Sequence, residues 1–189
     1  MKDLLDRLLQ RLENAQRVVI LGTGEVKMTD DGVGPYIATE LLDKSNEKVL
    51  VINAGIDPMA RMDEIIEFKP SHLIVIDTCT LDREPGTVAI LERKNMMDLV
   101  PISTHTVPIH VIIDLIVEEL PDLDVFMLGI VPESVEGIYD LKQYKEEDLS
   151  VEEINANKDL PFFSIELTDT IQETADALIK VIKKLIQEI

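Results

Sequence analysis

Apolar residues recur along this chain with two spacings, one typical of amphipathic helices and one typical of buried strands. Leucines spaced three to four residues apart mark one face of residues 2–14, which predicts an N-terminal helix. Short runs rich in Val and Ile predict strands at residues 17–22, 48–55, 71–78 and 124–131. Helical spacing predicts further helices at residues 35–44, 59–68 and 108–120, and a last helix that begins near Thr170.

Capping signals accompany three of these predicted helices. Pro35 suits the first position of its helix, and Thr106 could cap the helix that starts at Pro108. Thr170 and Glu173 have the spacing of a capping box.

Residues 84–93 depart from the alternation of strands and helices. They contain a Pro-Gly turn and a short alternating run, with no helix before it, so this run could pair antiparallel at a sheet edge. The whole pattern predicts a three-layer α/β/α fold with a twisted, mostly parallel sheet of about five strands. Residues 1–189 are interpreted as a single α/β domain with a polar, acidic excursion at residues 139–166.

Charge and composition exclude several classes of partner. The formal net charge of -19 repels nucleic acid and anionic lipid surfaces. No run approaches the ~18 apolar residues of a membrane span, and the charged N-terminal stretch does not resemble a signal peptide. One cysteine excludes an internal disulfide and fits a reducing compartment, so a cytoplasmic protein is expected.

Acidic and imidazole side chains follow several predicted strands. Asp30 and Asp31 follow the first strand, Asp77 ends the third, and His105 precedes the helix at residues 108–120. Ligands of open parallel sheets gather at the carboxyl ends of the strands. Two carboxylates and one imidazole gathered there would suit a divalent transition metal such as nickel, zinc or manganese.

Each of these side chains also has a structural explanation. Asp30 and Asp31 could cap the helix that follows them. Asp77 is the more specific signal, because an Asp after a buried apolar run needs a partner. His110, one turn from Asp114, is interpreted as a surface or boundary contact.

Two further candidates are interpreted as structural. His72 precedes a strand, and Cys79 is a lone thiol, which is more often buried than reactive. Neither is assigned a role in the site.

The Gly22–Thr23–Gly24 turn resembles part of a dinucleotide-binding loop but lacks the rest of that fingerprint. Lys27 stands where a third glycine is required, and Asn53 stands where an acidic residue would bind the ribose. The neighbouring aspartates would also repel a pyrophosphate. No cofactor-binding residues are therefore assigned.

Several stretches taken together resemble the maturation endopeptidases of nickel-iron hydrogenases. They are LGTGEVKMTDDGVGPYIA (21–38), LIVIDT (73–78), PGTV (85–88), STH (103–105) and LGIVPES (128–134) with Gly137. The resemblance extends to about residue 138. It implies an α/β endopeptidase that removes a C-terminal peptide from the hydrogenase large-subunit precursor after nickel insertion.

The resemblance also implies the site and the partner. Asp31, Asp77 and His105 correspond to the family's nickel-binding trio and are predicted as both metal ligands and catalytic residues. The nickel would be carried by the substrate, although zinc, cadmium or calcium could take its place in a crystal. The protein is expected to act as a monomer on that precursor, with no nucleic acid or membrane partner.

The chain departs from the family pattern at two places. Glu25 replaces the usual Asn after the Gly-x-Gly, and Asn53 to Ile56 replace the usual Asp-x-Gly-Thr. Two alternatives stay open: a non-enzymatic metal-binding or chaperone module on the same scaffold, and a small-molecule hydrolase or phosphorylase. The last would need an anion site near Gly22 to Gly24, where Lys27 is the one basic residue.

Overall fold

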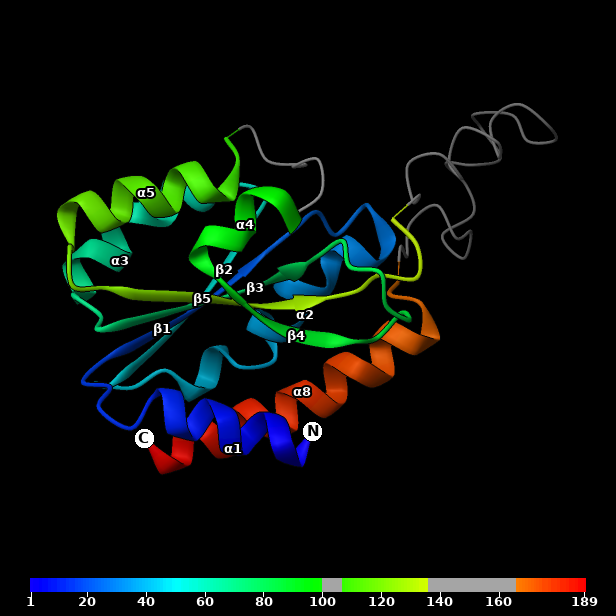
Figure 1. Ribbon diagram of the computed structural model, residues 1–189, viewed down its shortest axis with the longest axis horizontal. Coiled ribbons are helices and arrows are strands. Elements are labelled where there is room, and N and C mark those ends of the chain that lie inside the picture. The colour runs from blue at the N-terminus through cyan, green and yellow to red at the C-terminus, as the bar shows by residue number, and fades with distance from the viewer. Residues whose placement is uncertain (100–106, 136–165) are drawn as a thin grey trace, which may run out of the picture.

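The computed structural model describes residues 1–99, 107–135 and 166–189, which form a five-stranded sheet between helices (Figure 1). The strands are β1 (Val18–Thr23), β2 (Val49–Gly55), β3 (His72–Thr78), β4 (Val88–Glu92) and β5 (Asp124–Ile130). Their order is β2-β1-β3-β5-β4, with every pair parallel except β4 and β5. The predicted fold class is confirmed, including the antiparallel edge strand within residues 84–93.

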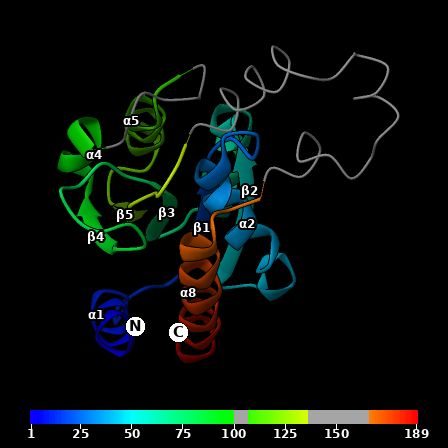
Figure 2. The same cartoon turned by 90° about the vertical axis from the view of Figure 1, so that its right-hand side faces the viewer.

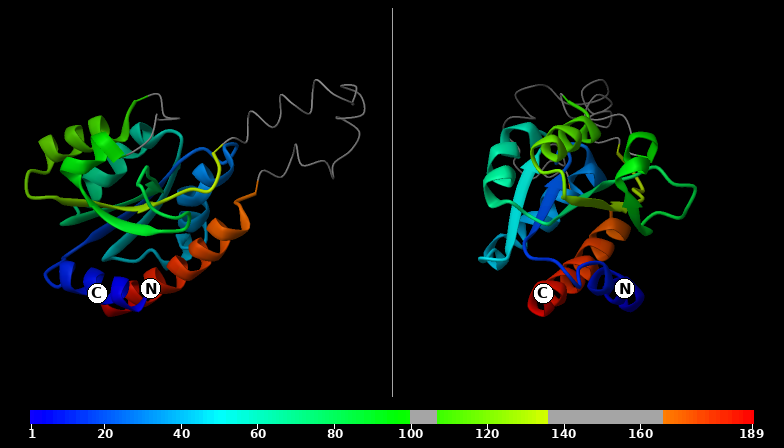
Figure 3. Two further views of the ribbon diagram at one scale, coloured as in Figure 1. Left: turned by 45° about the vertical axis from the view of Figure 1, so that its right-hand side comes forward. Right: turned by 60° about the vertical axis from the view of Figure 1, so that its left-hand side comes forward.

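Helices cover both faces of the sheet (Figures 2 and 3). One face packs against α1 (Lys2–Arg11), α2 (Val33–Thr39) and α8 (Asp169–Glu188). The other packs against α3 (Met62–Phe68), α4 (Arg93–Leu99) and α5 (Ile109–Glu119). Short 3-10 turns η1 (Thr29–Gly32), η2 (Leu42–Lys44) and η3 (Pro58–Arg61) lie between strands and helices.

The core is divided by the sheet into two apolar layers. Val18 and Ile20 of β1 belong to the layer under α1, α2 and α8, whereas Val19 and Leu21 belong to the opposite layer. Successive strand residues point to opposite faces, so a strand covered on both sides must be apolar at every position. This explains why the strands read as continuous Val, Ile and Leu runs.

The strand order reverses between β1 and β3. From β1 the chain moves to β2 on one side and then returns to β3 on the other side. Gly22 of β1 lies beside Ile76 of β3, so the carboxyl ends of these two strands are neighbours. In an open α/β sheet such a reversal leaves a crevice in which ligands bind.

Helix α2 lies very close to the carboxyl ends of β1 and β3. A Cβ atom on Gly34 would lie 2.2 Å from the Thr23 carbonyl oxygen and 2.4 Å from that of Ile76. A Cβ atom on Gly22 would lie 2.2 Å from the Gly34 oxygen. These glycines are required because backbone packs directly on backbone.

Strand predictions agree with the structure to within one or two residues, whereas several helix boundaries were wrong. The helix predicted at 35–44 ends at Thr39. It begins earlier than predicted, at Val33, because η1 runs directly into α2. Pro35 is therefore the third helical residue, where a missing N–H costs no intrahelical hydrogen bond. The N-terminal helix ends at Arg11 instead of residue 14.

The predicted capping box at Thr170 and Glu173 was also wrong. Helix α8 begins at Asp169, and its N-cap, Thr168, makes no side-chain cap. The Thr168 hydroxyl donates instead to Asp30, 138 residues away in the chain. Thr106, the other predicted cap, lies outside the described residues.

Helix α4 was not predicted, and the helix predicted at residues 59–68 begins as the 3-10 turn η3. The α4 sequence buries one apolar side chain, Met96, so it carries little helical periodicity. In η3 the Asp57 carboxylate accepts a hydrogen bond from the Ala60 N–H and caps the turn.

Helices α1 and α8 lie side by side under one face of the sheet (Figure 1). In the described part of the chain, no helix has both the length and the apolar character needed to cross a membrane. The predicted excursion at residues 139–166 lies outside the described residues except for Glu166.

Candidate functional site

Asp31 lies in the turn η1, within the loop that follows β1, and is 8% exposed. One carboxylate oxygen accepts a hydrogen bond from the Glu25 backbone N–H at 2.7 Å. The other accepts one from the Thr78 hydroxyl at 3.0 Å. These donors orient Asp31 between its own loop and the end of β3.

Asp77 is the penultimate residue of β3 and is 3% exposed. It accepts a hydrogen bond from the Thr23 hydroxyl at 2.7 Å and another from the Thr78 backbone N–H at 2.7 Å. Thr23 is the last residue of β1, so the bond joins the ends of two adjacent strands. The predicted buried carboxylate at this strand end is confirmed.

Thr78 donates to both carboxylates, with its hydroxyl to Asp31 and its N–H to Asp77. Two residues separated by 46 positions in the sequence therefore meet at the reversal of strand order. Two buried carboxylates near each other repel unless a positive charge lies between or beside them. The hard oxygen ligands of such a pair suit a divalent cation.

His105, the predicted third member, lies outside the described residues, so its place in the trio stays a prediction. Within residues 1–99, 107–135 and 166–189, no three His, Cys, Asp or Glu side chains form a group that could hold a metal. The structure therefore brings Asp31 and Asp77 together and leaves the imidazole untested.

Asp30, the neighbour of Asp31, points to different partners. It is fully buried, and its oxygens accept hydrogen bonds from the N–H groups of Glu133, Ser134 and Thr168 and from the Thr168 hydroxyl. The prediction that this Asp caps the following helix was wrong, because these donors come from residues after β5 and from the N-cap of α8. A residue-spacing argument could not find them, since they lie more than 100 positions away.

The Gly-x-Gly turn is closed by contacts within the protein. The Gly24 N–H donates to the Gly55 carbonyl oxygen at 3.0 Å, and the Glu25 N–H donates to Asp31. Two N–H groups that a phosphate loop would offer to its ligand are therefore already used. The side chain of Glu25 accepts from the Lys27 N–H, which further orders the loop.

The remaining sequence candidates lie in the packed interior or at other surfaces. Cys79 is buried against Gly129, and burial raises the pKa of its thiol to about 11, with the Asp77 charge adding to the effect. Such a thiol is a poor nucleophile at neutral pH. The predicted partner of His110, Asp114, is bound by Arg93 of α4.

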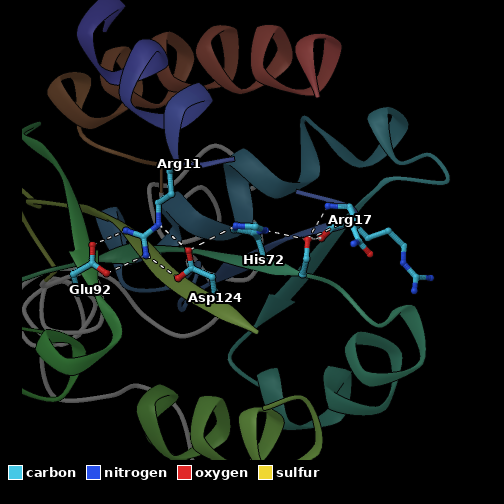
Figure 4. Close-up of polar contacts among 7 residues, drawn as sticks. Arg11, Arg17, His72, Glu92 and Asp124 are labelled. Atoms are coloured by element: carbon cyan, nitrogen blue, oxygen red, sulfur yellow. Dashed lines mark hydrogen bonds and ion pairs between the residues drawn. The ribbon is translucent and has the colours of Figure 1, made fainter. Parts of the chain in front are cut away.

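A separate ionic cluster at the amino end of the sheet was not foreseen from the sequence (Figure 4). Arg11 of α1 binds Glu92 of β4 through both terminal nitrogens and also binds Asp124 of β5. His72 lies 3.7 Å from Asp124 on the other side. Its Nδ1 lies 3.0 Å from the Ser71 hydroxyl, so the prediction that His72 is structural fits this contact.

A pocket of about 420 Å³ borders the turn that carries Asp31. Thr29 and Gly32 of η1 line it together with Tyr36, Asn53 and Gln172. The pocket thus joins the β1 loop to the edge strand β2 and to the start of α8. Asp31 and Asp77 are not among the residues that line it.

Comparison with known proteins supports one family. The family model for hydrogenase maturation proteases of the HycI type matches residues 35–153. A Methanocaldococcus jannaschii protein named as a hydrogenase maturation protease is 30% identical over 139 residues, which cover 69% of this chain and 81% of that protein. The Escherichia coli hydrogenase 3 maturation protease is 29% identical over 125 residues, covering 66% and 79%.

Solved structures show the same fold. The crystal structure of a NiFe hydrogenase maturation protease, HycI, from Thermococcus kodakarensis covers 96% of this chain and 99% of its own, with a TM-score of 0.72 and 23% identity. The maturating endopeptidase HybD from Escherichia coli has a TM-score of 0.59 and 19% identity, covering 91% and 93%. At these identities the likeness establishes the fold.

The family match decides between the alternatives that the sequence left open. The matching family and the similar proteins all bear the names of proteases, so the prediction of a peptidase is confirmed. The family model extends over more than half of the residues. The chain belongs to the hydrogenase maturation protease family.

Proposed function

We propose that this protein is the endopeptidase that removes the C-terminal peptide of a nickel-iron hydrogenase large-subunit precursor once nickel has been inserted. The single observation that carries the proposal is the contact of Thr78 with both Asp31 and Asp77. It holds two buried carboxylates at the reversal of strand order, where a ligand would enter the crevice.

The metal in this proposal belongs to the substrate. Asp31 and Asp77 would bind the nickel ion that the precursor carries, with His105 as the predicted third ligand. Because these ligands come from separate segments and leave other positions to the precursor, affinity for free nickel should be modest. A precursor without nickel would lack the charge that these carboxylates recognise.

Binding through the metal would also position the bond to be cut. A substrate held at its own nickel site presents a fixed polypeptide segment to the enzyme. The bond to be cut is then already in position relative to the catalytic groups. The pocket beside η1 provides room for that segment. A bound metal can further polarise a carbonyl group or activate a water molecule.

The test is cleavage of matched precursors. The purified protein is incubated with nickel-loaded and nickel-free forms of large-subunit precursors, and products are measured by intact mass. We expect a shortened product from one nickel-loaded precursor and none from its nickel-free form. Equal cleavage of both forms would contradict recognition of nickel, and cleavage of neither form of any precursor from the same source would contradict the proposed activity.

Asn variants of the two carboxylates are the matched controls. An Asn at 31 or 77 can keep the described hydrogen bonds, because its amide oxygen can face the N–H donor and its NH2 group can face a threonine hydroxyl. Asp31→Asn and Asp77→Asn should therefore fold normally and lose the charge, with cleavage reduced by at least about 100-fold. Wild-type cleavage by both variants would remove these residues from the mechanism.

A further inference from the structure

Asp30 joins three segments that are far apart in the sequence. Its carboxylate is 0% exposed, and one oxygen accepts from the Thr168 N–H at 2.7 Å. The other oxygen accepts from the Glu133 and Ser134 N–H groups at 2.9 and 2.8 Å and from the Thr168 hydroxyl at 3.1 Å. The Asp30 N–H in turn donates to the Ser134 carbonyl oxygen at 3.1 Å.

This arrangement requires a carboxylate. Both oxygens accept backbone N–H groups, so an amide side chain would place its NH2 group against an N–H donor in either orientation. Hydrogen bonds from neutral donors to a buried charge are strong, and they offset the cost of removing that charge from water. Asp30 differs in this respect from Asp31 and Asp77, whose described contacts tolerate an amide.

The backbone of η1 needs such an anchor. Thr29, the residue before Asp30, has a φ of 49°, which is unfavourable for a β-branched residue. Strained backbone of this kind persists where the surrounding contacts determine the conformation. Asp30 and Asp31 are consecutive residues of this short turn, so holding the Asp30 side chain restrains the backbone from which the Asp31 side chain extends.

We propose that Asp30 is a positioning residue for the reaction: its hydrogen bonds to residues 133, 134 and 168 hold η1 so that Asp31 meets Thr78 beside Asp77. The residues that bind Asp30 stand on either side of residues 136–165 in the sequence. The start of α8 and the end of β5 are thereby fastened to the loop that carries the proposed nickel ligand. The effect on cleavage rests on the proposed function, whereas the effect on the position of Asp31 does not.

The test combines Asp30→Asn with a readout at Asp31 itself. Aspartate is labelled with 13C at the carboxyl carbon, and the Asp31 signal is assigned by its loss in Asp31→Asn. In Asp30→Asn we expect the Asp31 carboxyl signal and the Glu25 amide signal to shift, while the Asp124 signal at the opposite end of the sheet stays in place. Cleavage of the nickel-loaded precursor should fall about 100-fold, as expected for a misplaced catalytic group.

A second variant separates position from charge and from loss of folding. Thr168→Val removes the hydroxyl donor to Asp30 without changing any charge, and it removes no cap from α8. It should shift the same two signals by a smaller amount, and Thr168→Ser should restore them. Unmoved Asp31 and Glu25 signals in Thr168→Val would overturn the positioning role. If the signals shift as expected but the wild-type protein cuts no precursor, the positioning role stands and the proposed function is refuted.

Discussion

The carboxylates at the two ends of the sheet are bound by different kinds of hydrogen-bond donor. At the amino end, Glu92 and Asp124 are bound by Arg11 (Figure 4). The Arg11 guanidinium also lies 4.3 Å from the centre of the Phe126 ring. At the carboxyl end, the donors described for Asp31 and Asp77 are hydroxyl and backbone N–H groups.

The difference is one of charge compensation. A guanidinium group neutralises the carboxylates that it binds, so the amino end is suited to fastening α1 onto β4 and β5. Neutral donors orient a carboxylate and leave its negative charge in place. The donors described at the carboxyl end thus orient Asp31 and Asp77 without cancelling their charge, in keeping with the proposed cation site, whereas Arg11 neutralises the carboxylates at the amino end.

The ends also differ in what holds the neighbouring helix. Helix α2 packs backbone on backbone against β1 and β3 through Gly34, whereas α1 is tied to the sheet by the side chain of Arg11. Changes at the first contact should disturb the site, and changes at the second should affect stability alone.

The largest effect is expected from Gly34→Ala. Its Cβ atom would lie 2.2 Å from the Thr23 oxygen and 2.4 Å from the Ile76 oxygen, so strand ends and helix must separate. We expect a loss of about 3 kcal/mol in the free energy of unfolding, measured by urea denaturation, together with loss of precursor cleavage.

Gly55→Ala is the matched control for that change. Gly55 has a φ of 52°, but among the described residues beyond its two chain neighbours the atom nearest to an added Cβ would be Asn53 Oδ1, at 4.0 Å. It should therefore cost about 1 kcal/mol from backbone conformation alone. Equal losses in the two variants would show that close packing of α2 is not what holds the carboxyl end together.

A smaller effect is expected from Arg11→Met. Met keeps an apolar stem over the Phe126 ring but loses the bonds to Glu92 and Asp124. Because both carboxylates are partly exposed and can return to water, we expect a loss of about 1–2 kcal/mol in denaturant unfolding. Cleavage of the nickel-loaded precursor per folded molecule should be unchanged. A tenfold fall would contradict the claim that the Arg11 contact affects stability alone.

The smallest effect concerns His72 and pH. Burial lowers the pKa of His72, with Asp124 opposing this shift and Arg11 reinforcing it. The folded protein thus binds this proton less tightly than the unfolded chain, so the associated stability is present above a pH of about 6.5 and declines as pH falls below it. The midpoint of thermal unfolding should drop between pH 7.5 and 5.5 more in the wild type than in His72→Gln, and an equal drop in both would contradict this linkage.

Local patterns in the sequence were sufficient for the strands and for the fold class. Continuous apolar runs such as residues 71–78 identify strands covered on both faces, and their alternation with helices predicts the layers. Helix ends were less predictable, because α2 continues directly from η1 and the N-cap residue of α8, Thr168, donates its hydroxyl hydrogen bond to Asp30.

For the site, the sequence could indicate the residues but not their contacts. Asp77 stands out because it ends an apolar run, and Asp31 because it lies in the loop that follows the first strand. Strand-end geometry predicts that the two share one edge of the sheet. The roles of two adjacent aspartates could not be separated in this way. Asp30 and Asp31 have the same chemistry, and only their distant partners differ.

The sequence by itself determined an acidic α/β chain, the places of its strands and the carboxylates at their ends, because period and residue type are local properties. The tertiary structure decided which strand ends became neighbours and that Thr78 donates hydrogen bonds to both Asp31 and Asp77. It also decided that the Asp30 carboxylate accepts hydrogen bonds from distant backbone N–H groups. The physical reason is that a hydrogen bond depends on distance and direction in space, whereas Asp30 and Thr168, whose bonded atoms lie 2.7 Å apart, are separated by 138 positions along the chain.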